Sequence, residues 1–481
     1  MPFLKSQPNF FGQLRRFLLA KLNFPSPKRT LVLWRIAIRG EERDYTRGPI
    51  GRAVFLLAVP MILELVMESV FAVVDIFFVS RLGAEAISVV GLTEAVVTLV
   101  YAVAIGLSMA ATAMVARRIG AQDREGAQRA AGQVLWAGFI AALVIAAIGL
   151  SFGAEILKLM GAEDAVLAQG VQYTQIMLAG SGTILYLFLI NAIFRGAGDA
   201  AIAMRSLWLA NIVNIILDPL LIFGIGPFPE MGVTGAAVAT TIGRGCGVLY
   251  QCWYLFGVRG RLQLRMYHLA FQFKIMLRLL RLSLGGVFQF IIATSAWIGL
   301  MRIVAPFGSE AVAGYTIAVR IIIFTILPAW GLGNAAATLV GQNLGAGQAD
   351  RASRSAWIAA KYNVYFMVLV MLVFITLAPQ LIGIFSDQPM VLEYGASSLR
   401  IISYGYAFFA IGMVLVQALN GAGDTDTPTV INFFCYWLVQ IPLAWWLANQ
   451  LEFGPHGVFW AVTIAETLIA IVDRVKIKIG H

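Results

Sequence analysis

The 481-residue chain is too apolar for a soluble globular protein, since 60% of its residues are hydrophobic, 12% are charged and the mean hydropathy is +0.82. Soluble domains carry about 25% charged residues. The composition excludes an ordinary water-soluble enzyme and predicts an integral membrane protein. The net charge of the chain is +10, and the positions of the basic residues relative to the membrane therefore need an explanation.

Residues 1–52 form a basic segment that precedes the apolar part of the chain. Eleven Lys or Arg residues stand against three acids and alternate with apolar residues such as Phe10, Phe17 and Trp34. This pattern is typical of a cytoplasmic or interfacial segment that lies on anionic lipid. Simple disorder is the alternative. The segment lacks the apolar stretch and cleavage site of a secretory signal peptide.

Twelve apolar runs follow, and each is long enough to cross a bilayer as a helix, which takes about 20 residues. Helices are expected because a helix satisfies its backbone hydrogen bonds within one segment. The expected spans are 53–80, 88–116, 130–152, 168–194, 205–226, 233–256, 276–304, 311–340, 356–378, 395–419, 426–448 and 454–475. We therefore predict an all-α integral membrane protein with twelve transmembrane helices.

The distribution of Lys and Arg predicts the orientation of these spans. Positive residues stay on the cytoplasmic side, and they gather in alternate loops, for example Arg117 after the second span, Arg195 beside the fourth and Arg351 after the eighth. The pattern places both termini in the cytoplasm, together with a connection at 257–275 and a tail at 476–481. Topology then explains the positive charge without nucleic-acid binding.

The second half of the sequence repeats the first half at a constant offset. Gly120-Ala corresponds to Gly345-Ala, and Gly196-Ala-Gly-Asp corresponds to Gly421-Ala-Gly-Asp in the same register. The repeat predicts two pseudo-symmetric six-helix bundles, an N-lobe at 53–256 and a C-lobe at 276–475, related by an axis along the membrane normal. Two lobes around a central cleft favour a transporter that works by alternating access over a channel.

Acidic residues inside apolar spans are costly and are functional candidates by default. In the first span, Glu64, Glu68 and Asp75 are separated by four and seven residues, which places them on one helix face. We expect this face to line a cavity. The alternatives are an ion pair between Asp75 and Arg81 and interior hydrogen bonds for the glutamates. The second half is poorer in such acids.

Asn211, Asn214 and Asp218 form a polar stripe in the fifth span, and Pro219 removes a helix hydrogen bond beside them. Asp75 and Asp218 both fall in the outer halves of their helices, so we expect them to share one pocket. Such a pair can carry a proton, and with an amide and a hydroxyl it can also bind Na⁺. A helix-ending Asp-Pro turn is the alternative for Asp218.

Four motifs together resemble multidrug and toxic compound extrusion (MATE) transporters. The motifs are Pro60-Met-Ile-Leu-Glu-Leu-Val-Met-Glu-Ser, Val74-Asp-Ile-Phe-Phe-Val-Ser-Arg-Leu-Gly, Phe194-Arg-Gly-Ala-Gly-Asp and Asn214-Ile-Ile-Leu-Asp-Pro. The resemblance runs from about residue 50 to the end of the chain. It implies the fold of that family and of its MOP superfamily, with twelve helices in two lobes.

Within this family the chain resembles the DinF-like branch, which couples transport to cations through acids of the N-lobe. The resemblance implies a cation-coupling role for Asp75 and Asp218, with Asn214 and Thr240 as co-ligands. It leaves both protonation and Na⁺ binding by these four residues open. The NorM-like branch uses a carboxylate in the seventh helix, where this chain has Gln289.

The expected function is a secondary active antiporter, not an enzyme, that exports small amphipathic, cationic organic compounds in exchange for H⁺ or Na⁺. No cofactor other than this coupling ion is expected. A flippase for lipid-linked precursors, which requires a basic cavity, is the main alternative, and a membrane-embedded enzyme is the remote one. The expected substrate cleft contains Glu64, Met67, Glu68, Phe71, Asn191 and Asn211.

The expected partners follow from this function. They are small organic substrates and membrane lipids, with no nucleic acid, and the chain is expected to act as a monomer. The expected location is the inner (cytoplasmic) membrane of a bacterium or an archaeon.

Overall fold

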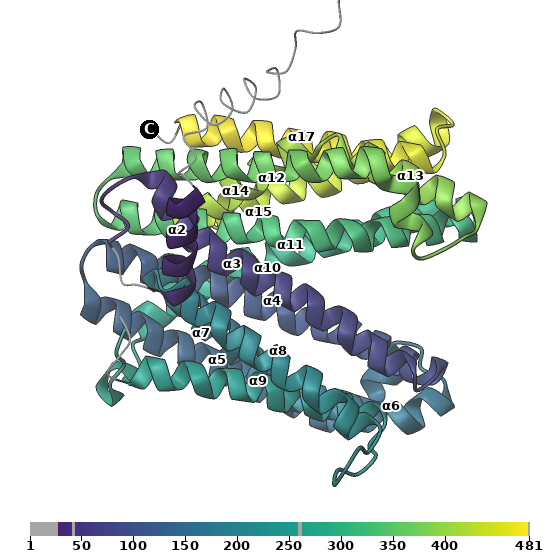
Figure 1. Cartoon of the computed structure of the whole chain (residues 1–481), viewed down its shortest axis with the longest axis horizontal. Helices are drawn as coiled ribbons and strands as arrows, with labels where there is room; N and C mark the ends of the chain where they lie inside the picture. Colours follow the sequence, from purple (N-terminus) through teal and green to yellow (C-terminus); the bar gives the residue numbers. More distant parts are fainter. Residues whose placement is uncertain (1–26, 41–43, 258–261, 480–481) are drawn as a thin grey trace, which may run out of the picture.

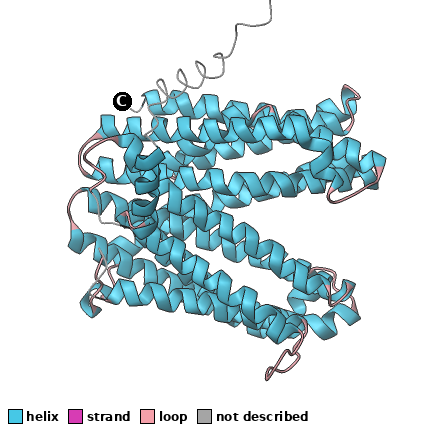
Figure 2. Cartoon of the chain, viewed as in Figure 1, coloured by secondary structure: helices cyan, strands magenta, loops and turns pink. Residues whose placement is uncertain are grey.

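The computed structural model describes residues 27–40, 44–257 and 262–479, which fold into helices joined by loops and contain no strand (Figure 2). A bilayer imposes this outcome, because the backbone of each apolar run has to satisfy its own hydrogen bonds. The expected lipid-surface segment lies outside the described residues up to position 26.

The first half of the described chain contains α2 (Pro27–Arg39), α3 (Ile50–Ser80), α4 (Ala84–Gly120), α5 (Arg124–Leu159), α6 (Asp164–Ala179), α7 (Ser181–Ala197), α8 (Ala200–Ile222), α9 (Val233–Phe256) and the short 3-10 helix η1 (Met266–Leu269). The second half contains α10 (Phe273–Val304), η2 (Ala305–Phe307), α11 (Ser309–Gly345), α12 (Ala349–Gly383), α13 (Pro389–Ser403), α14 (Tyr406–Ala422), α15 (Asp426–Asn432), the π-helix η3 (Phe433–Gln440), α16 (Ile441–Trp445), the π-helix η4 (Trp446–Gln450) and α17 (Pro455–Ile479).

Each expected span coincides with one of these helices or with a continuous run of them. Within the described residues, nine helices or helix runs are long and apolar enough to cross a membrane, and the bent pair α13 and α14 makes ten. α3 and α9, outside that set, are 31 and 24 residues long. At about 1.5 Å per residue, both are long enough for an apolar core of about 30 Å.

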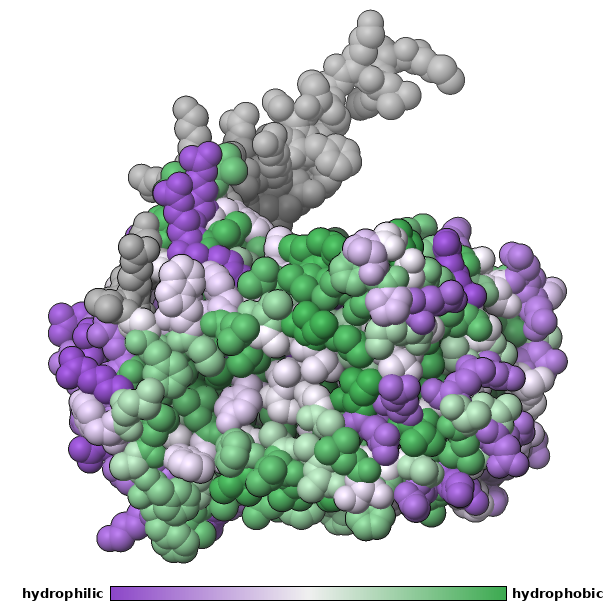
Figure 3. Space-filling view, turned by 90° about the horizontal axis from the view of Figure 1, so that it is seen from below, coloured by the Kyte–Doolittle hydropathy of each residue, from purple (hydrophilic) through white to green (hydrophobic). Residues whose placement is uncertain are grey.

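The helices form two bundles, which we call the N-terminal arm (α3–α9) and the C-terminal arm (α10–α17). The arms meet at one end and diverge toward the other, where α6 and α13 lie (Figure 1). α2 lies across the joined end. On the face shown in Figure 3, apolar side chains form a broad band and hydrophilic side chains gather at both ends. This distribution is that of a protein that spans a membrane.

At the joined end, α4 and α11 touch through their backbones. A Cβ atom at Gly120 would lie 1.8 Å from the carbonyl oxygen of Gln342, and one at Gly345 would lie 1.9 Å from the carbonyl oxygen of Arg117. No side chain fits at such distances, so glycine is required at both positions. The two glycines stand at corresponding positions of the repeat, and their contacts hold the arms together.

The repeat is also visible in the positions of other glycines. Gly106 on α4 packs against the backbone of α10, and Gly331 on α11 packs against the backbone of α3. The fourth span of each arm is interrupted at a repeat-related glycine, Gly180 between α6 and α7 and Gly405 between α13 and α14. The two arms therefore share one plan of packing as well as one sequence pattern.

Candidate functional site

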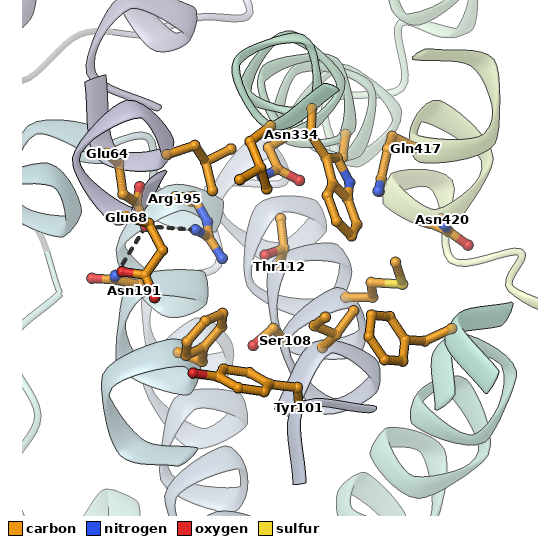
Figure 4. A pocket seen from close by; sticks show the side chains of 18 of the residues that line it. Glu64, Glu68, Tyr101, Ser108, Thr112, Asn191, Arg195, Asn334, Gln417 and Asn420 are labelled. Atoms are coloured by element: carbon orange, nitrogen blue, oxygen red, sulfur yellow. Dashed lines mark hydrogen bonds and ion pairs between the residues drawn. The ribbon is translucent and has the colours of Figure 1, made fainter. Parts of the chain in front are cut away.

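A cavity of about 320 Å³ lies between the two arms (Figure 4). α3, α4, α7 and α8 form its wall on one side, and α10, α11 and α14 form it on the other. The wall is mainly apolar and includes the rings of Tyr101, Phe188, Phe290 and Trp330. Cavities of about 300–1,000 Å³ with apolar walls and few polar groups are typical of small-molecule sites.

Glu64 and Arg195 form a buried ion pair in the wall of this cavity. The guanidinium of Arg195 donates to Oε1 of Glu64 at 2.9 Å, and the side chains are 11% and 4% exposed for Arg195 and Glu64 respectively. Asn191 donates to the same oxygen at 3.0 Å (Figure 4). Because Arg195 compensates its charge, Glu64 does not present a free negative charge to a ligand.

Glu68 lies one helical turn further along α3 and also faces a basic residue. Its carboxylate accepts a hydrogen bond from Asn211 at 3.1 Å, and one of its oxygens lies 3.9 Å from the guanidinium of Arg244. Arg244 is 5% exposed and donates to the hydroxyl of Tyr101 at 2.7 Å. The ring of Phe71 lies 5.9 Å from the same guanidinium.

Asp218 is fully buried, and neither of its carboxylate oxygens has a hydrogen-bond partner among the described residues. Asn214, one turn earlier on α8, donates to the hydroxyl of Thr240 at 3.0 Å, and its own side-chain oxygen is likewise unpaired in this part of the structure. A buried carboxylate is costly unless its charge is compensated. These oxygen atoms therefore fit a proton or a small cation.

Asp75 lies close enough to Asp218 for the two carboxylates to interact electrostatically. Glu94 and Arg244 also lie within this range of Asp75. The two acids on α3 and α8 thus belong to one charged cluster inside the N-terminal arm. Arg81, the alternative partner of Asp75, stacks over the ring of a neighbouring phenylalanine at 4.6 Å.

The described part of the chain contains no group of three or more His, Cys, Asp or Glu side chains that is suited to a metal ion. A Na⁺ ion at Asp218 would therefore depend on the neutral oxygens of Asn214 and Thr240. Oxygen atoms of this kind are the ligands that hard cations prefer. The residues present fit such an ion, and they fit a proton equally well.

The structure divides the six residues that the sequence predicts for the cleft into two groups. Three of them line the central cavity: Glu64, Glu68 and Asn191. The other three are not part of its wall: Met67, Phe71 and Asn211. Two of these still act on the site, because Asn211 holds Glu68 and Phe71 lies against Arg244.

Sequence reasoning misses several residues of the cavity. It places Arg195 beside a cytoplasmic loop, but the residue lies in the last turn of α7 and reaches Glu64 in the cavity wall. Its spacing of four residues from Asn191 is the signal that indicates a common helix face. Trp330 and Asn420 come from the C-terminal arm, where the sequence has fewer charges to mark them.

Comparisons with known proteins point to one family. The family model described as MatE matches residues 60–220 and 287–446, which together make up more than half of the chain. A probable multidrug resistance protein NorM of Thermotoga maritima is 29% identical over 424 residues, which cover 87% of this chain and 90% of that protein. An FAD transporter of Shewanella oneidensis is 28% identical over 428 residues, which cover 88% of this chain and 93% of that protein.

A solved structure has the same fold. It is described as the outward-facing conformation of a multidrug resistance MATE family transporter of the MOP superfamily. The two structures superpose with a TM-score of 0.85 at 26% sequence identity, and the match covers 91% of this chain and 99% of that chain. The expected all-helical membrane fold is thereby confirmed.

Proposed function

Because the chain belongs to the MatE family, and is therefore a multi-pass membrane transporter and not an enzyme, we propose that it exports small amphipathic, cationic organic compounds in exchange for H⁺ or Na⁺. Similar proteins include a probable multidrug resistance protein and multidrug export proteins. The central cavity supports this proposal, since it has the size and the aromatic wall of a site for such compounds.

The observation that carries the coupling mechanism is the state of Asp218. This residue is fully buried without a hydrogen-bond partner among the described residues, and it lies within electrostatic range of Asp75. Uptake of a proton or Na⁺ compensates the buried negative charge of Asp218. Release of that cation restores the free-energy cost of an uncompensated buried carboxylate. Binding at Asp218 is therefore able to shift the arm between two arrangements, which is what antiport requires.

The two arms act as the moving units in this mechanism, with 53–256 and 276–475 as the lobes. The structure represents one state, joined at the end where α4 and α11 touch. Arg117, Arg118 and the basic residues at the start of α12 lie at this joined end, and such residues stay in the cytoplasm. We therefore assign both termini to the cytoplasm and the divergent end to the outside.

We assign the chain to the DinF-like branch of the family. Asp75 and Asp218 supply acids in the N-terminal arm, with Asn214 and Thr240 beside them. In the seventh span, Gln289 stands where the NorM-like branch has a carboxylate, and it is hydrogen-bonded to Asn420. The family model itself does not distinguish these branches.

The charges of the cavity favour small substrates over lipid-linked phosphates. Arg195 is the one basic residue in the described wall of the cavity, and Glu64 already compensates its positive charge. Glu68 also lines the cavity, and Arg244, its basic neighbour, is held by Tyr101. A flippase would need uncompensated basic side chains for a pyrophosphate, and the described wall does not offer them.

We further propose that the chain acts as a monomer in the inner membrane of a bacterium or an archaeon, with α2 at the lipid surface. α2 exposes Leu31, Val32 and Trp34 together with Arg35 and Arg39. A helix with exposed apolar and basic residues suits the interface between anionic headgroups and acyl chains.

The test is dye export from proteoliposomes that contain the purified protein. An ethidium-like cation is loaded, and proton and sodium gradients are imposed in turn. The native protein is compared with Asp75→Asn, Asp218→Asn and the control Asp387→Asn, whose side chain is exposed in a loop. Equal amounts of folded protein are reconstituted for each variant.

We expect one gradient to drive export by the native protein and by the control, and both N-terminal variants to lose at least nine-tenths of the rate. Export that neither gradient drives would contradict antiport. Normal export by both variants would contradict the assignment of Asp75 and Asp218, while leaving the transport function standing.

A further inference from the structure

The last helix carries two buried acids that the site above does not use. Glu466 and Asp473 are seven residues apart on α17, so they lie on the same helix face. Their exposed fractions are 9% and 0%. The sequence expectation that the second half is poorer in intramembrane acids overlooks this pair, because no Asn or Gln accompanies the two acids on α17 and Asp473 stands next to Arg474 near the end of the span.

Asp473 has no compensating partner among the described residues. Both of its carboxylate oxygens are buried, and neither has a hydrogen-bond partner in this part of the chain. An ionised carboxylate in this position loses its hydration without regaining hydrogen bonds, which costs several kcal/mol. A proton or a cation must therefore accompany this group for the buried arrangement to be stable.

Glu466 borders a side cavity of about 180 Å³ in the C-terminal arm. The hydroxyl of Tyr436, on the π-helix η3, donates to Oε1 of Glu466 at 3.0 Å. The wall of this side cavity also contains the amides Gln289 and Asn432. π-helical turns are rare and are found frequently at functional sites. The π-helical backbone of η3 is therefore a second indication that the surroundings of Glu466 are functional.

The side cavity adjoins the central cavity. Phe290, Trp330 and Gln417 belong to the walls of both. Glu466 therefore lies beside a cavity that shares part of its wall with the space between the arms. The neighbouring Asp473 lies two turns further along α17, in electrostatic range of Glu466.

No described basic side chain pairs with either acid. Arg474 follows Asp473 in the chain, but it is exposed and makes no ion pair with Asp473 in the described structure. Tyr436 and Cys435 face the two acids from η3, and each of these groups feels the negative charge of both. α10, α13, α14, α15 and α16 also pack on α17, but none adds a basic group to the electrostatics of either carboxylate. Arg281 on α10 is 3.9 Å from an exposed aspartate instead.

We propose that Glu466 and Asp473 form a second cation site, in the C-terminal arm, which takes up a proton or Na⁺ from the side cavity. The inference rests on the proposed antiport, because it gives that exchange a cation site in each arm. The new site is not a copy of the first one. In the last span of each arm, Gly457-Val-Phe-Trp-Ala-Val-Thr-Ile aligns with Gly235-Ala-Ala-Val-Ala-Thr-Thr-Ile, so the counterparts of Glu466 and Asp473 are Arg244 and Gln251, and neither of these is an acid.

The test measures cation binding directly and does not depend on transport. Infrared difference spectra between acid and alkaline pH are recorded on protein in lipid nanodiscs, with and without Na⁺, to detect protonated carboxyl groups. The starting protein is the variant Asp75→Asn/Asp218→Asn, which lacks the N-terminal site. Glu466→Gln and Asp473→Asn are added singly and together, and Glu393→Gln, an exposed acid on α13, is the control.

We expect a buried carboxyl signal that survives in the starting variant and in the control and disappears when both C-terminal acids are replaced. A signal that Na⁺ also abolishes identifies a sodium site, and one that only pH changes identifies a proton site. Identical spectra with and without Glu466 and Asp473 would overturn the proposal. The single variants keep this test valid if the combined variant does not fold, because each removes its own part of the signal.

A transport measurement distinguishes a failure of this inference from a failure of the proposed function. In the otherwise native chain, Glu466→Gln is expected to lower the number of cations exchanged per exported molecule while export continues. If the native protein exports nothing but the carboxyl signal behaves as expected, antiport is wrong and the second site stands. If Glu466→Gln leaves that ratio unchanged, the second site has no part in coupling.

Discussion

Arg195 and Asn420 stand at corresponding positions of the repeat, and each binds the side chain at the repeat-related position in the first span of its own arm. Arg195 pairs with Glu64, whereas Asn420 exchanges two hydrogen bonds with Gln289 at 3.0 and 3.1 Å. The same geometry is therefore built from opposite charges in one arm and from neutral amides in the other.

This relationship predicts how the N-terminal pair responds to substitution. Glu64→Gln leaves the buried Arg195 without its counter-charge, and breaking such a pair costs about 3–5 kcal/mol. The double variant Glu64→Gln/Arg195→Asn reproduces the amide pair of the other arm and is expected to recover most of that loss. Thermal unfolding of the purified proteins in one detergent measures both effects.

The control for this experiment is Glu163→Gln, which changes an exposed acid outside the cavity. Its unfolding temperature is expected to match that of the native protein. A single variant Glu64→Gln that is as stable as the native protein would show that the ion pair adds nothing to the fold.

The backbone contact between α4 and α11 predicts a second result. Gly120→Ala and Gly345→Ala place a methyl group 1.8 Å and 1.9 Å, respectively, from a carbonyl oxygen of the opposite arm, so the joined end has to open. We expect a longer distance between spin labels at Arg124 and Asp350, at the exposed starts of α5 and α12, measured by electron paramagnetic resonance.

The labelled proteins require replacement of the free cysteines, and export by this background is checked first. Gly91→Ala is the matched control, because it also lies in α4 but has open space around its missing side chain. An unchanged distance in both glycine variants would mean that the arms separate at another place.

Arg244 provides a third prediction. Its side chain is buried between Glu68 and Tyr101, so Arg244→Gln leaves an acid without its basic neighbour and is expected to lower the free energy of unfolding by about 3 kcal/mol. Arg244→Lys keeps the charge but lacks the planar group that reaches Tyr101 and the neighbouring rings. We expect only partial recovery of the unfolding temperature. Full recovery by lysine would show that charge alone matters.

Asp123 gives a prediction that depends on pH. It caps α5 by accepting a hydrogen bond from the backbone of Gly126 at 2.8 Å, and this bond, with Arg118 beside it, holds the pKa of the carboxyl below its usual range. A lowered pKa contributes stability above the unfolded value of about 3.9, and that contribution is lost as the pH falls through the folded value.

Asp123→Ala is therefore expected to cost about 0.5–1 kcal/mol near neutral pH, a modest value because the side chain is 44% exposed. The difference from the native protein should shrink below about pH 4. Unfolding temperatures at neutral and acid pH measure it, and a difference that stays constant across this range would contradict the role of the ionised cap.

The sequence predicts the parts of this molecule that depend on local patterns. Apolar runs locate the helices, the repeat indicates two related arms, and helical spacing places Glu64 and Glu68 together on one face of α3. The partners of these acids depend on contacts between helices that are far apart along the chain. A single sequence carries no signal for such contacts.

The same limit explains why sequence reasoning does not identify the two acids of α17 as a candidate site. Asp218 stands out in the sequence because Asn211 and Asn214 mark the same stripe, whereas α17 has no Asn or Gln that marks the face of Glu466 and Asp473. The polar partner of Glu466 is Tyr436, which lies on another helix, the π-helix η3. The spacing of seven residues between the two acids is present in the sequence, but only the packing of the arm shows that both side chains are buried.

The unequal pairs at repeat-related positions also limit how the two halves can be exchanged. A chain made of two copies of the first half would face its cavity with two Glu–Arg pairs, and a chain made of two copies of the second half would have none. Neither duplicate would keep one charged and one neutral wall. Although the molecule arose by repetition, its two halves are not interchangeable at this position.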